Sequence, residues 1–268
     1  MTQGFDCHAH VYARVDEAKG SNYRPLQPAP LDEWQGYLEA CSLSGGVLVQ
    51  PSFLGNDNRE LLQILGKLGK NYRGVVQLPK EAGLAQMSEL NAAGIVGVRW
   101  NLIERRRELP NLDDPLWIDF LDRLKALNWH LELHLEGNRL PELFPALHQH
   151  GVTLVIDHLG LPVEADPFAD SGFRLLLEAG RGGRTWVKLS APYRSPVHDL
   201  RPHVRALLDE LGRERLVWGS DWPWTRHEGK HSYRDTLDWL TGWVSNENDR
   251  RYIMEKSPQA LFRLGEIT

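Results

Sequence analysis

Short apolar runs rich in β-branched residues recur along the chain and alternate with stretches whose apolar residues follow helical spacing. Eight runs have the length and composition of buried strands: 4–10, 46–52, 74–79, 94–101, 130–136, 152–159, 185–191 and 216–223. The segments between and after them predict helices: 31–42, 58–70, 84–93, 115–128, 140–150, 173–180, 202–211, 233–244 and 248–262. This alternation predicts a parallel sheet covered by helices.

Eight strand–helix repeats are the number that closes such a sheet into a barrel. The sequence therefore predicts an α/β fold, a (β/α)₈ TIM barrel formed by residues 1–268 as a single domain. An open Rossmann-like sheet is the weaker alternative, because no GxGxxG follows the first strand and no GxxxxGK followed by Ser or Thr occurs. Residues 12–30 include Pro25, Pro28 and Pro30, so we expect a long loop there.

Composition excludes several classes of partner. The chain has 31 basic and 36 acidic side chains, a formal net charge of -5, which argues against non-specific binding of nucleic acid. No apolar run approaches the ~18 residues of a membrane span, and the first residues lack the pattern of a signal peptide. Cys7 and Cys41 are too few for a disulfide framework. We expect a cytoplasmic protein with no membrane partner, and the sequence does not predict an oligomeric state.

Polar side chains cluster in the first predicted strand. Asp6, His8 and His10 alternate with Cys7 and Ala9, and the two-residue period of a strand would put the three polar side chains on one face. A His-x-His pair at the carboxyl end of a barrel strand can bring two nitrogens to one metal ion or one substrate oxygen. This strand end is therefore a candidate part of an active site.

Three further strand ends carry residues of the same kind. His134 lies in the fifth strand, His158 ends the sixth and Asp221 ends the eighth. In a barrel these ends meet at one rim, where we expect the four segments to converge. His134 has an alternative role in a structural polar network with Glu132 and Glu136 of the same strand.

The strand-end segments resemble a known family. Residues 6–10 (Asp-Cys-His-Ala-His), 156–160 (Ile-Asp-His-Leu-Gly) and 219–223 (Gly-Ser-Asp-Trp-Pro) resemble the amidohydrolase-related family of (β/α)₈ hydrolases. Residues 50–58 and 97–101 resemble its lactonase branch, which includes 2-pyrone-4,6-dicarboxylate lactonase. The resemblance therefore extends over nearly the whole chain.

This resemblance implies a hydrolase that opens the ring of a carboxylate-bearing lactone, such as 2-pyrone-4,6-dicarboxylate, in the breakdown of aromatic compounds. Asp221 would take a proton from water while His8, His10 and His158 polarise the lactone carbonyl. Many family members use a divalent metal, but the lactonase branch works without one, so we expect none to be required. Any Zn²⁺ or Mn²⁺ bound here would be held by those four residues and His134.

Arginines near several strand ends indicate an anionic substrate, because a guanidinium group binds a carboxylate as a two-pronged fork. Arg99, Arg105 and Arg194 are the candidates, although the run 105–107 can also be a solvated charge cluster. Leu161 stands where the branch carries Arg after its His-x-Gly motif. This departure leaves other cyclic lactones open as substrates, including sugar lactones.

Further substrate contacts are predicted beside the matching motifs: Tyr12, Ser52, Trp100, His134 and Trp222. The two indole rings would be suited to stack on a planar pyrone or a sugar face. His227 and His231 lie in the loop predicted after the eighth strand, where we expect solvent exposure, with a role in supporting the site or in a lid as the alternative.

Two other functions remain possible from the sequence. The same barrel could be a metal-dependent amidohydrolase or decarboxylase. A non-catalytic carbohydrate-binding barrel built around the ten tryptophans is a third reading, but it does not explain an acid and imidazoles at strand ends.

Overall fold

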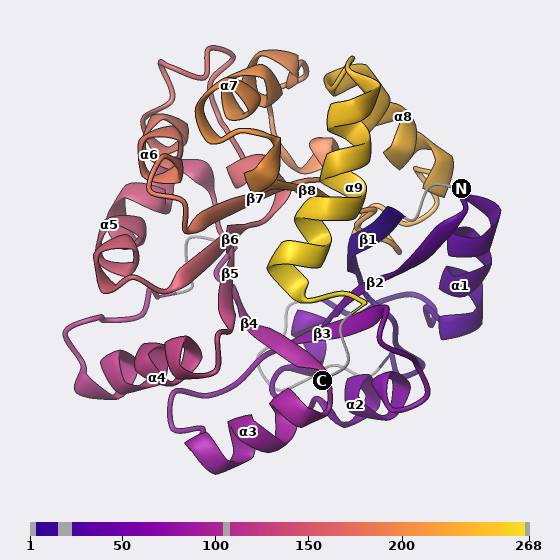
Figure 1. Ribbon diagram of the computed structural model, residues 1–268, viewed down its shortest axis with the longest axis vertical. Helices are drawn as coiled ribbons and strands as arrows, with labels where there is room; N and C mark the ends of the chain where they lie inside the picture. Colours follow the sequence, from indigo (N-terminus) through magenta and orange to yellow (C-terminus); the bar gives the residue numbers. More distant parts are fainter. Residues whose placement is uncertain (1–3, 16–22, 104–107, 266–268) are drawn as a thin grey trace.

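Every predicted apolar run overlaps a strand, and each strand pairs in parallel with the next one along the chain. The computed structural model describes residues 4–15, 23–103 and 108–265. Its strands are β1 (Gly4–Ala9), β2 (Leu43–Val49), β3 (Tyr72–Val76), β4 (Ile95–Asn101), β5 (His130–His134), β6 (Thr153–Ile156), β7 (Thr185–Leu189) and β8 (Leu216–Trp218). They form one sheet in the order β1 to β8, as Figure 1 shows.

The sheet closes on itself where the end of β1 meets the segment after β8. The amide of His10 donates to the carbonyl of Trp222, and the amide of Asp221 donates to the carbonyl of His8, both at 2.8 Å. Gly219 permits this approach, because a Cβ atom there would lie 2.6 Å from the Cβ of His8. Since an open sheet has two free edges, this closure confirms the predicted (β/α)₈ barrel and makes the Rossmann-like alternative wrong.

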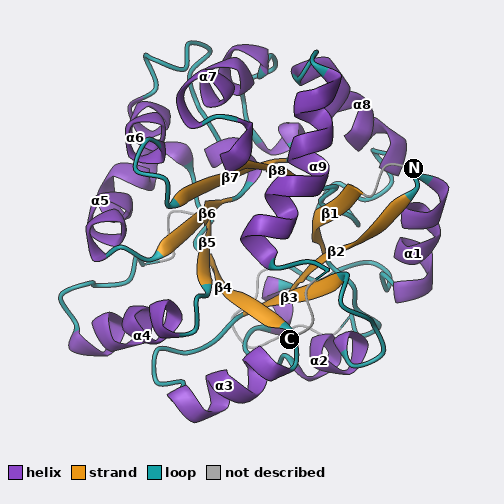
Figure 2. Ribbon diagram, in the orientation of Figure 1, coloured by secondary structure: helices purple, strands orange, loops and turns teal. Residues whose placement is uncertain are grey.

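Helices surround the barrel in the order that the apolar spacing predicts (Figure 2). They are α1 (Leu31–Ala40), α2 (Arg59–Leu65), α3 (Leu84–Ala92), α4 (Pro115–Ala126), α5 (Leu140–His150), α6 (Ser171–Gly180), α7 (Arg201–Leu211), α8 (Tyr233–Trp243) and α9 (Glu247–Phe262). Several begin at side-chain caps: Asp170 accepts from the amide of Phe173, and Ser232 forms a capping box with Asp235. Within the described residues, none of these helices has the length and apolar character needed to span a membrane.

A small apolar core fills the amino end of the barrel. It consists of Phe5, Cys7, Val47, Val49, Val75, Val96, Val155, Trp186 and Val217, together with Phe262 and Leu264 from the end of the chain. Phe262 is fully buried, and its ring centroid lies 5.3 Å from that of His130 at the start of β5. Helix α9, in yellow in Figure 1, therefore crosses the barrel and closes this end.

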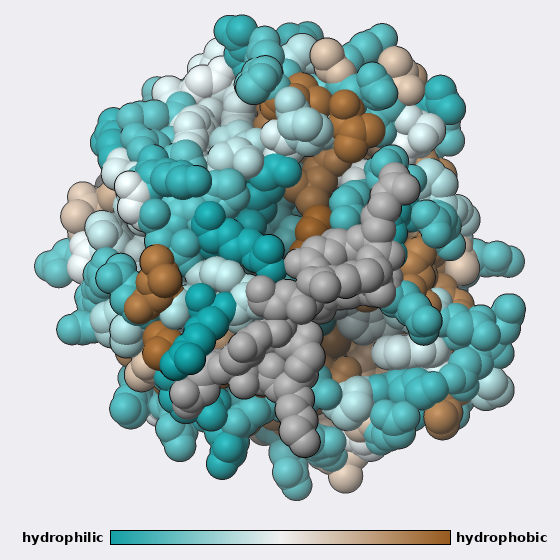
Figure 3. All heavy atoms as spheres, turned by 180° about the vertical axis from the view of Figure 1, so that it is seen from behind, coloured by the Kyte–Doolittle hydropathy of each residue, from teal (hydrophilic) through white to brown (hydrophobic). Residues whose placement is uncertain are grey.

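Polar groups occupy the opposite end of the barrel, where the strands finish. Figure 3 views that side of the molecule and shows hydrophobic residues beside hydrophilic ones. The predicted long loop after β1 contributes to this end. Its described part is tied back by a two-way backbone pairing between Tyr12 and Ala29, at 2.9 and 2.8 Å.

Candidate active site

A shift in strand pairing decides which polar side chains of β1 face the barrel interior. The register with β2 shifts between Asp6 and Ala9. His8 and His10 meet near the carboxyl end of the barrel, where their Nε2 atoms lie 3.3 Å apart. Asp6 instead contacts the surrounding helices. Regular alternation would have put all three side chains on one face, so that prediction is wrong for Asp6.

The buried carboxylate of Asp6 ties the barrel to its helices. Its Oδ2 accepts hydrogen bonds from Trp34 of α1 at 2.9 Å, Tyr233 of α8 at 2.8 Å and the Ser220 hydroxyl at 2.6 Å. Its Oδ1 accepts from the amides of Ser220 at 2.8 Å and His8 at 3.2 Å. Asp6 therefore holds the turn after β8 against β1, which positions the reactive groups without touching the cavity.

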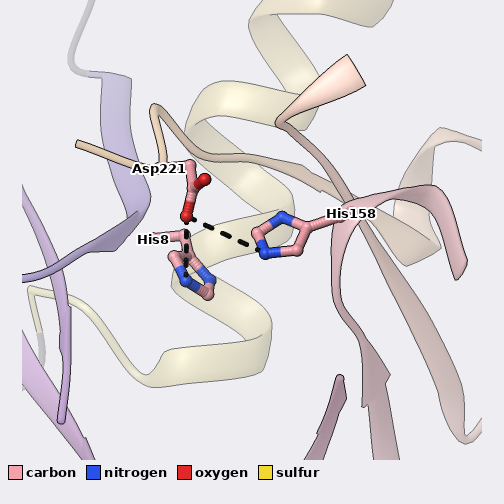
Figure 4. Close-up of side chains that lie close together, drawn as sticks. All are labelled: His8, His158 and Asp221. Atoms are coloured by element: carbon pink, nitrogen blue, oxygen red, sulfur yellow. Dashed lines mark ion pairs between the residues drawn. The ribbon is translucent and has the colours of Figure 1, made fainter. Parts of the chain in front are cut away.

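The two oxygens of the Asp221 carboxylate have different surroundings. Oδ2 accepts from the Tyr193 hydroxyl at 2.6 Å and from Arg194 Nε at 2.8 Å. Oδ1 is buried without a hydrogen-bond partner and lies 3.6 Å from His8 Nε2 and 3.8 Å from His158 Nε2, as Figure 4 shows. Burial opposes ionisation, but the Arg194 guanidinium outweighs it and holds the pKa of Asp221 well below its usual range. The group is therefore a carboxylate at neutral pH.

Left-handed backbone occurs at three strand ends of the site. The φ angles are 51° at His158 after β6, 47° at Ala191 after β7 and 57° at Asp221 after β8. Residues with a Cβ rarely adopt this conformation, and such strain persists only where the surrounding structure enforces it. The backbone thus turns sharply where the predicted functional side chains leave the sheet.

His10 and His158 are each anchored at Nδ1. His10 Nδ1 lies 2.8 Å from the Val49 carbonyl, and His158 Nδ1 lies 2.8 Å from the Ser190 hydroxyl. Burial, with the neighbouring His8, lowers the pKa of His10 to about 3. Burial also lowers the pKa of His158 well below its ordinary value. Both rings are therefore neutral at physiological pH.

Arg99 is engaged with buried carboxylates rather than free for a substrate anion. Its Nε lies 2.8 Å from Asp157 Oδ2 and 3.3 Å from Glu132 Oε1, and its Nη2 lies 3.0 Å from His134 Nδ1. Burial and this guanidinium lower the pKa of His134 well below its ordinary value. Arg99 thus combines a position on the cavity wall with a structural role behind His134.

A lysine at the centre of the barrel is absent from the predicted site. Lys188 Nζ lies 2.5 Å from Glu132 Oε2, 3.0 Å from His8 Nδ1 and 3.5 Å from Asp157 Oδ1, and all four side chains are buried. The signal that could have found it is alternation: in β7 this lysine stands between Val187 and Leu189, so it points inward where they point outward.

A cavity of about 250 Å³ opens above these groups. The predicted residues among those that line it are His10, Ser52, Arg99, His134, Arg194 and Asp221. Leu161 lines it as well, at the position where the family branch carries Arg. His8 and His158 are not among the lining residues and lie behind Asp221, with their Nε2 atoms 3.6 and 3.8 Å from its Oδ1. The structure therefore brings the predicted acid and imidazoles together.

The two predicted tryptophan contacts lie away from this cavity, which corrects that expectation. Trp100 follows the inward-facing Arg99, so alternation points it outward, where its ring centroid is 4.9 Å from that of Trp117 in α4. Trp222 is buried beside α1, with its ring centroid 6.2 Å from that of Tyr37. Both rings belong to the packing between barrel and helices.

The remaining predicted contacts have mixed outcomes. Tyr12 is outside the cavity lining, because its ring packs behind Phe53 with centroids 5.0 Å apart. Ser52 lines the cavity, and its hydroxyl accepts a hydrogen bond from the Asn101 amide at 2.8 Å. Arg105, together with its neighbours at 106 and 107, lies outside the described residues.

An aromatic group beside Arg194 was also not predicted. Tyr193 stacks on His231 with ring centroids 4.3 Å apart and lies 4.7 Å from the ring of His227, which lines the cavity. Both histidines are only partly exposed, which corrects the expectation of simple solvent exposure. This group supports the hydroxyl that binds Asp221.

The donor atoms around Asp221 are spaced like metal ligands. Those of His8, His158 and Asp221 lie within 4.8 Å of one another, and so do those of a second group, His134, Asp157 and His158. Zn–N bonds of about 2.0–2.1 Å imply roughly 3.3–3.4 Å between tetrahedral ligands. The 3.3 Å between His8 and His10 Nε2 matches that separation. Three of the five predicted ligands, His8, His158 and Asp221, are therefore spaced to hold one divalent ion.

Comparison with known proteins agrees with this geometry. The family model described as Amidohydrolase matches residues 5–264. The 4-sulfomuconolactone hydrolase of Hydrogenophaga intermedia is 27% identical, with 96% of this chain and 88% of that protein covered. The 2-pyrone-4,6-dicarboxylate hydrolase of Comamonas testosteroni is 28% identical, with 81% and 76% covered.

Solved structures agree as well. A candidate 2-pyrone-4,6-dicarboxylic acid hydrolase from Pseudomonas putida superposes with a TM-score of 0.90 at 36% identity, over 100% of both chains. The resemblance carried by the three strand-end segments is thereby confirmed. The chain belongs to the amidohydrolase family, over residues 5–264.

Proposed function

We propose that this protein is a hydrolase that opens the ring ester of a carboxylate-bearing lactone, most directly 2-pyrone-4,6-dicarboxylate or a related lactone. The observation that carries the proposal is the unpartnered Oδ1 of Asp221, which faces two imidazoles, those of His8 and His158. A buried carboxylate oxygen with no hydrogen-bond partner is placed to take a proton from water, and the depressed pKa of Asp221 keeps the group ionised. The lactone hydrolases among the relatives support the same reaction class.

In the proposed reaction, Asp221 Oδ1 removes a proton from a water molecule as that water attacks the lactone carbonyl. Ring N–H groups from His8 and its neighbours stabilise the negative charge that develops on the carbonyl oxygen. Collapse of the tetrahedral intermediate breaks the ring C–O bond. The proton held by Asp221 then passes to the departing ring oxygen, which leaves a ring-opened hydroxy acid or its keto form.

An anionic substrate is supported by the charge around the cavity. The guanidinium-bearing residues Arg99, Arg194 and Arg226 line it, together with the neutral hydrogen-bonding groups of Ser52 and Asn101. Arg194 is also bound to Asp221, so its predicted role in substrate binding is combined with holding the base. We propose a lactone carrying at least one carboxylate, oriented with that group toward Arg194 and Arg226, because Arg99 is held by Asp157 and Glu132.

We also propose that no metal is required. Two cationic groups already lie against the donor set: Lys188 is 3.0 Å from His8 Nδ1, and Arg194 Nη2 is 2.7 Å from Asp221 Oδ2. Both repel a further cation. If a divalent ion bound, His8, His10, His158 and Asp221 would hold it, with His134 at the edge, and it would supply Lewis-acid polarisation of the carbonyl.

The location and partners are proposals of the same kind. We propose a cytoplasmic enzyme whose partner is a small anionic lactone. The free state of Cys7 and Cys41 supports a reducing compartment.

The proposal is tested by assaying the purified protein on a panel of pyrone, muconolactone and aldonolactone substrates, with and without a chelator, beside the variant Asp221→Asn. We expect turnover of a carboxylate-bearing lactone that chelation does not change. In Asp221→Asn we expect kcat to fall by about 10²- to 10⁴-fold, because the amide cannot accept the proton, while the melting temperature stays near that of the wild type.

Asp209→Asn is the matched control, because this exposed aspartate on α7 pairs only with Arg205 among the described contacts. It should leave kcat unchanged. Robust turnover by Asp221→Asn would remove the proposed base. Activity that disappears on chelation and returns with Zn²⁺ would instead establish the metal-dependent alternative.

A further inference from the structure

Two of the imidazoles that would serve as metal ligands have a cationic donor behind them. Lys188 Nζ lies 3.0 Å from Nδ1 of His8, and Arg99 Nη2 lies 3.0 Å from Nδ1 of His134. Ammonium and guanidinium groups donate hydrogen bonds and have no lone pair to accept one. At each contact the imidazole Nδ1 must therefore be the acceptor, so it carries no proton.

Lys188 finds its acceptors at the centre of the barrel. Its Nζ forms hydrogen bonds with Glu132 Oε2 at 2.5 Å and His8 Nδ1 at 3.0 Å, and a second carboxylate oxygen, Asp157 Oδ1, lies 3.5 Å away as an ion-pair neighbour without a hydrogen bond. The lysine and both carboxylates are buried, so no bulk water replaces these partners. The contact with His8 is thus built into the barrel interior.

His10 shows the opposite arrangement and provides the contrast. Its Nδ1 lies 2.8 Å from the carbonyl of Val49, which only accepts, so the ring donates from Nδ1 and its Nε2 is an acceptor. His8 Nε2 lies 3.3 Å from that acceptor. With its proton on Nε2, His8 can donate to His10 Nε2 and accept from Lys188 at Nδ1. With its proton on Nδ1 alone, His8 can form neither hydrogen bond.

The charges at the centre of the barrel already balance when the imidazoles are neutral. Lys188 and Arg99 face the carboxylates of Glu132 and Asp157, two cations against two anions. No additional positive charge on His8 is needed to pair these carboxylates.

We infer that Lys188 and Arg99 are positioning residues that fix the protons of His8 and His134 on Nε2, so that both rings are poor metal ligands. His8 then donates to His10, and His134, which lines the cavity, presents an N–H donor to it. Metal-bound histidines coordinate through a ring nitrogen that carries no proton, and they normally donate their other N–H to a carboxylate, carbonyl or water. Of His8, His10 and His134, only His10 has such a partner, because its Nδ1 faces the carbonyl of Val49. Any use of these donors on a lactone carbonyl rests on the proposed function, whereas the proton positions do not.

The proton positions can be measured on the resting protein without a substrate. In wild-type protein with ¹⁵N-labelled histidine, long-range ¹H–¹⁵N correlation at pH 7.5 distinguishes protonated from unprotonated ring nitrogens. We expect unprotonated Nδ1 and protonated Nε2 in His8 and His134, and the reverse in His10, with signals assigned by loss in single His→Gln variants. A protonated Nδ1 in His8 and His134 would overturn the inference, whatever lactone the enzyme hydrolyses.

A variant tests the cause. In Lys188→Met the nearest groups to His8 Nδ1 become Asp157 Oδ1 at 3.4 Å and Glu132 Oε1 at 3.6 Å, both acceptors without a hydrogen-bond partner. The proton should therefore move to Nδ1 and leave Nε2 free for a metal. We expect Zn²⁺ to bind about 10- to 100-fold more tightly than to the wild type, the range by which partners behind metal ligands change affinity.

Lys125→Met, at an exposed position on α4, is the matched control and should leave Zn²⁺ affinity unchanged. The affinity is read by competition with a chromophoric chelator and by the zinc content of dialysed protein. Unchanged Zn²⁺ binding in folded Lys188→Met would overturn the inference. If this variant does not fold, the histidine spectra of the wild type decide the question alone. Failure of the proposed function would appear separately, as a wild type that hydrolyses no lactone of the panel.

Discussion

At the scale of single residues, the site depends on a difference between the two oxygens of the Asp221 carboxylate in their hydrogen bonding. One oxygen is held by Tyr193 and Arg194, and the other faces His8 and His158 without a hydrogen bond. Burial, followed by the neighbouring carboxylate, raises the pKa of Tyr193 well above its usual value, so its hydroxyl remains a donor. The held oxygen fixes the orientation of the carboxylate and leaves the other oxygen available for proton transfer.

The variant Tyr193→Phe tests this arrangement. Losing a donor to the ionised form should raise the pKa of Asp221, so the acidic limb of the kcat/KM profile should move to higher pH. We expect kcat to fall by about 10-fold, the scale of one lost hydrogen bond of about 1.4 kcal/mol to a charged group. Tyr252→Phe on α9, at the closed end of the barrel, is the control. An acidic limb that stays in place would show that Arg194 alone orients the carboxylate.

Sequence reasoning located the groups that lie on strand ends but not those whose direction depends on local backbone. His158 and Asp221 were found because the carboxyl ends of barrel strands must converge. Trp222 directly follows Asp221 and points into the helices, as alternation requires of the residue next to an inward-facing one, so its nearness in sequence to the site was a poor guide. Lys188 was missed although alternation in β7 points it inward, since a buried lysine is not expected without its partners in view.

At the scale of elements, the junction between β1 and β8 decides whether the site forms. The eighth strand was predicted to run to residue 223 but ends at Trp218. The reason is a side chain far away in sequence. Asp6 accepts a hydrogen bond from the amide of Ser220 at 2.8 Å, so this amide does not pair within the sheet. A hydrophobic pattern cannot show such a contact. The existence, order and pairing of the strands were predictable, because each depends on local periodicity.

Gly219→Ala tests the closeness of this junction. The new Cβ would lie 2.6 Å from the Cβ and 2.9 Å from the amide nitrogen of His8, so β8 must move away from β1. We expect a loss of about 1–3 kcal/mol in the free energy of unfolding, as for other overpacked sites, and a loss of activity as His8 and Asp221 separate. Urea unfolding and the lactone assay measure the two effects.

The matched control is Gly36→Ala in α1, where an added Cβ meets nothing within 4 Å. It should stabilise the protein slightly, because alanine favours the helix. Equal stability and activity of Gly219→Ala and the wild type would contradict the close packing of this junction.

At the scale of the whole molecule, the buried histidines make stability depend on pH. Burial lowers the pKa of His10, His130, His134 and His158 below the ordinary value of 6.5. As the pH falls below about 6.5, the unfolded chain binds protons that the folded protein still excludes, so the free energy of unfolding decreases. Aspartates such as Asp221 contribute a similar loss only at more acidic pH, because their unfolded pKa is about 3.9.

Urea unfolding at pH 7.5 and pH 5.5 measures this effect. We expect a decrease of roughly 1 kcal/mol for each histidine that remains neutral when folded, or several kcal/mol in total. His198→Gln removes an exposed histidine and should leave the difference unchanged. Equal stability at the two pH values, or greater stability at pH 5.5, would contradict the neutral state of these rings.

The closed amino end of the barrel has a consequence for how substrate enters and product leaves. Phe262 and its apolar neighbours fill that end, so the barrel interior is closed there. Under the proposed function, substrate and product must both pass through the carboxyl end, so the next lactone cannot reach Asp221 until the ring-opened product, which carries one more carboxylate, has left past the same arginines.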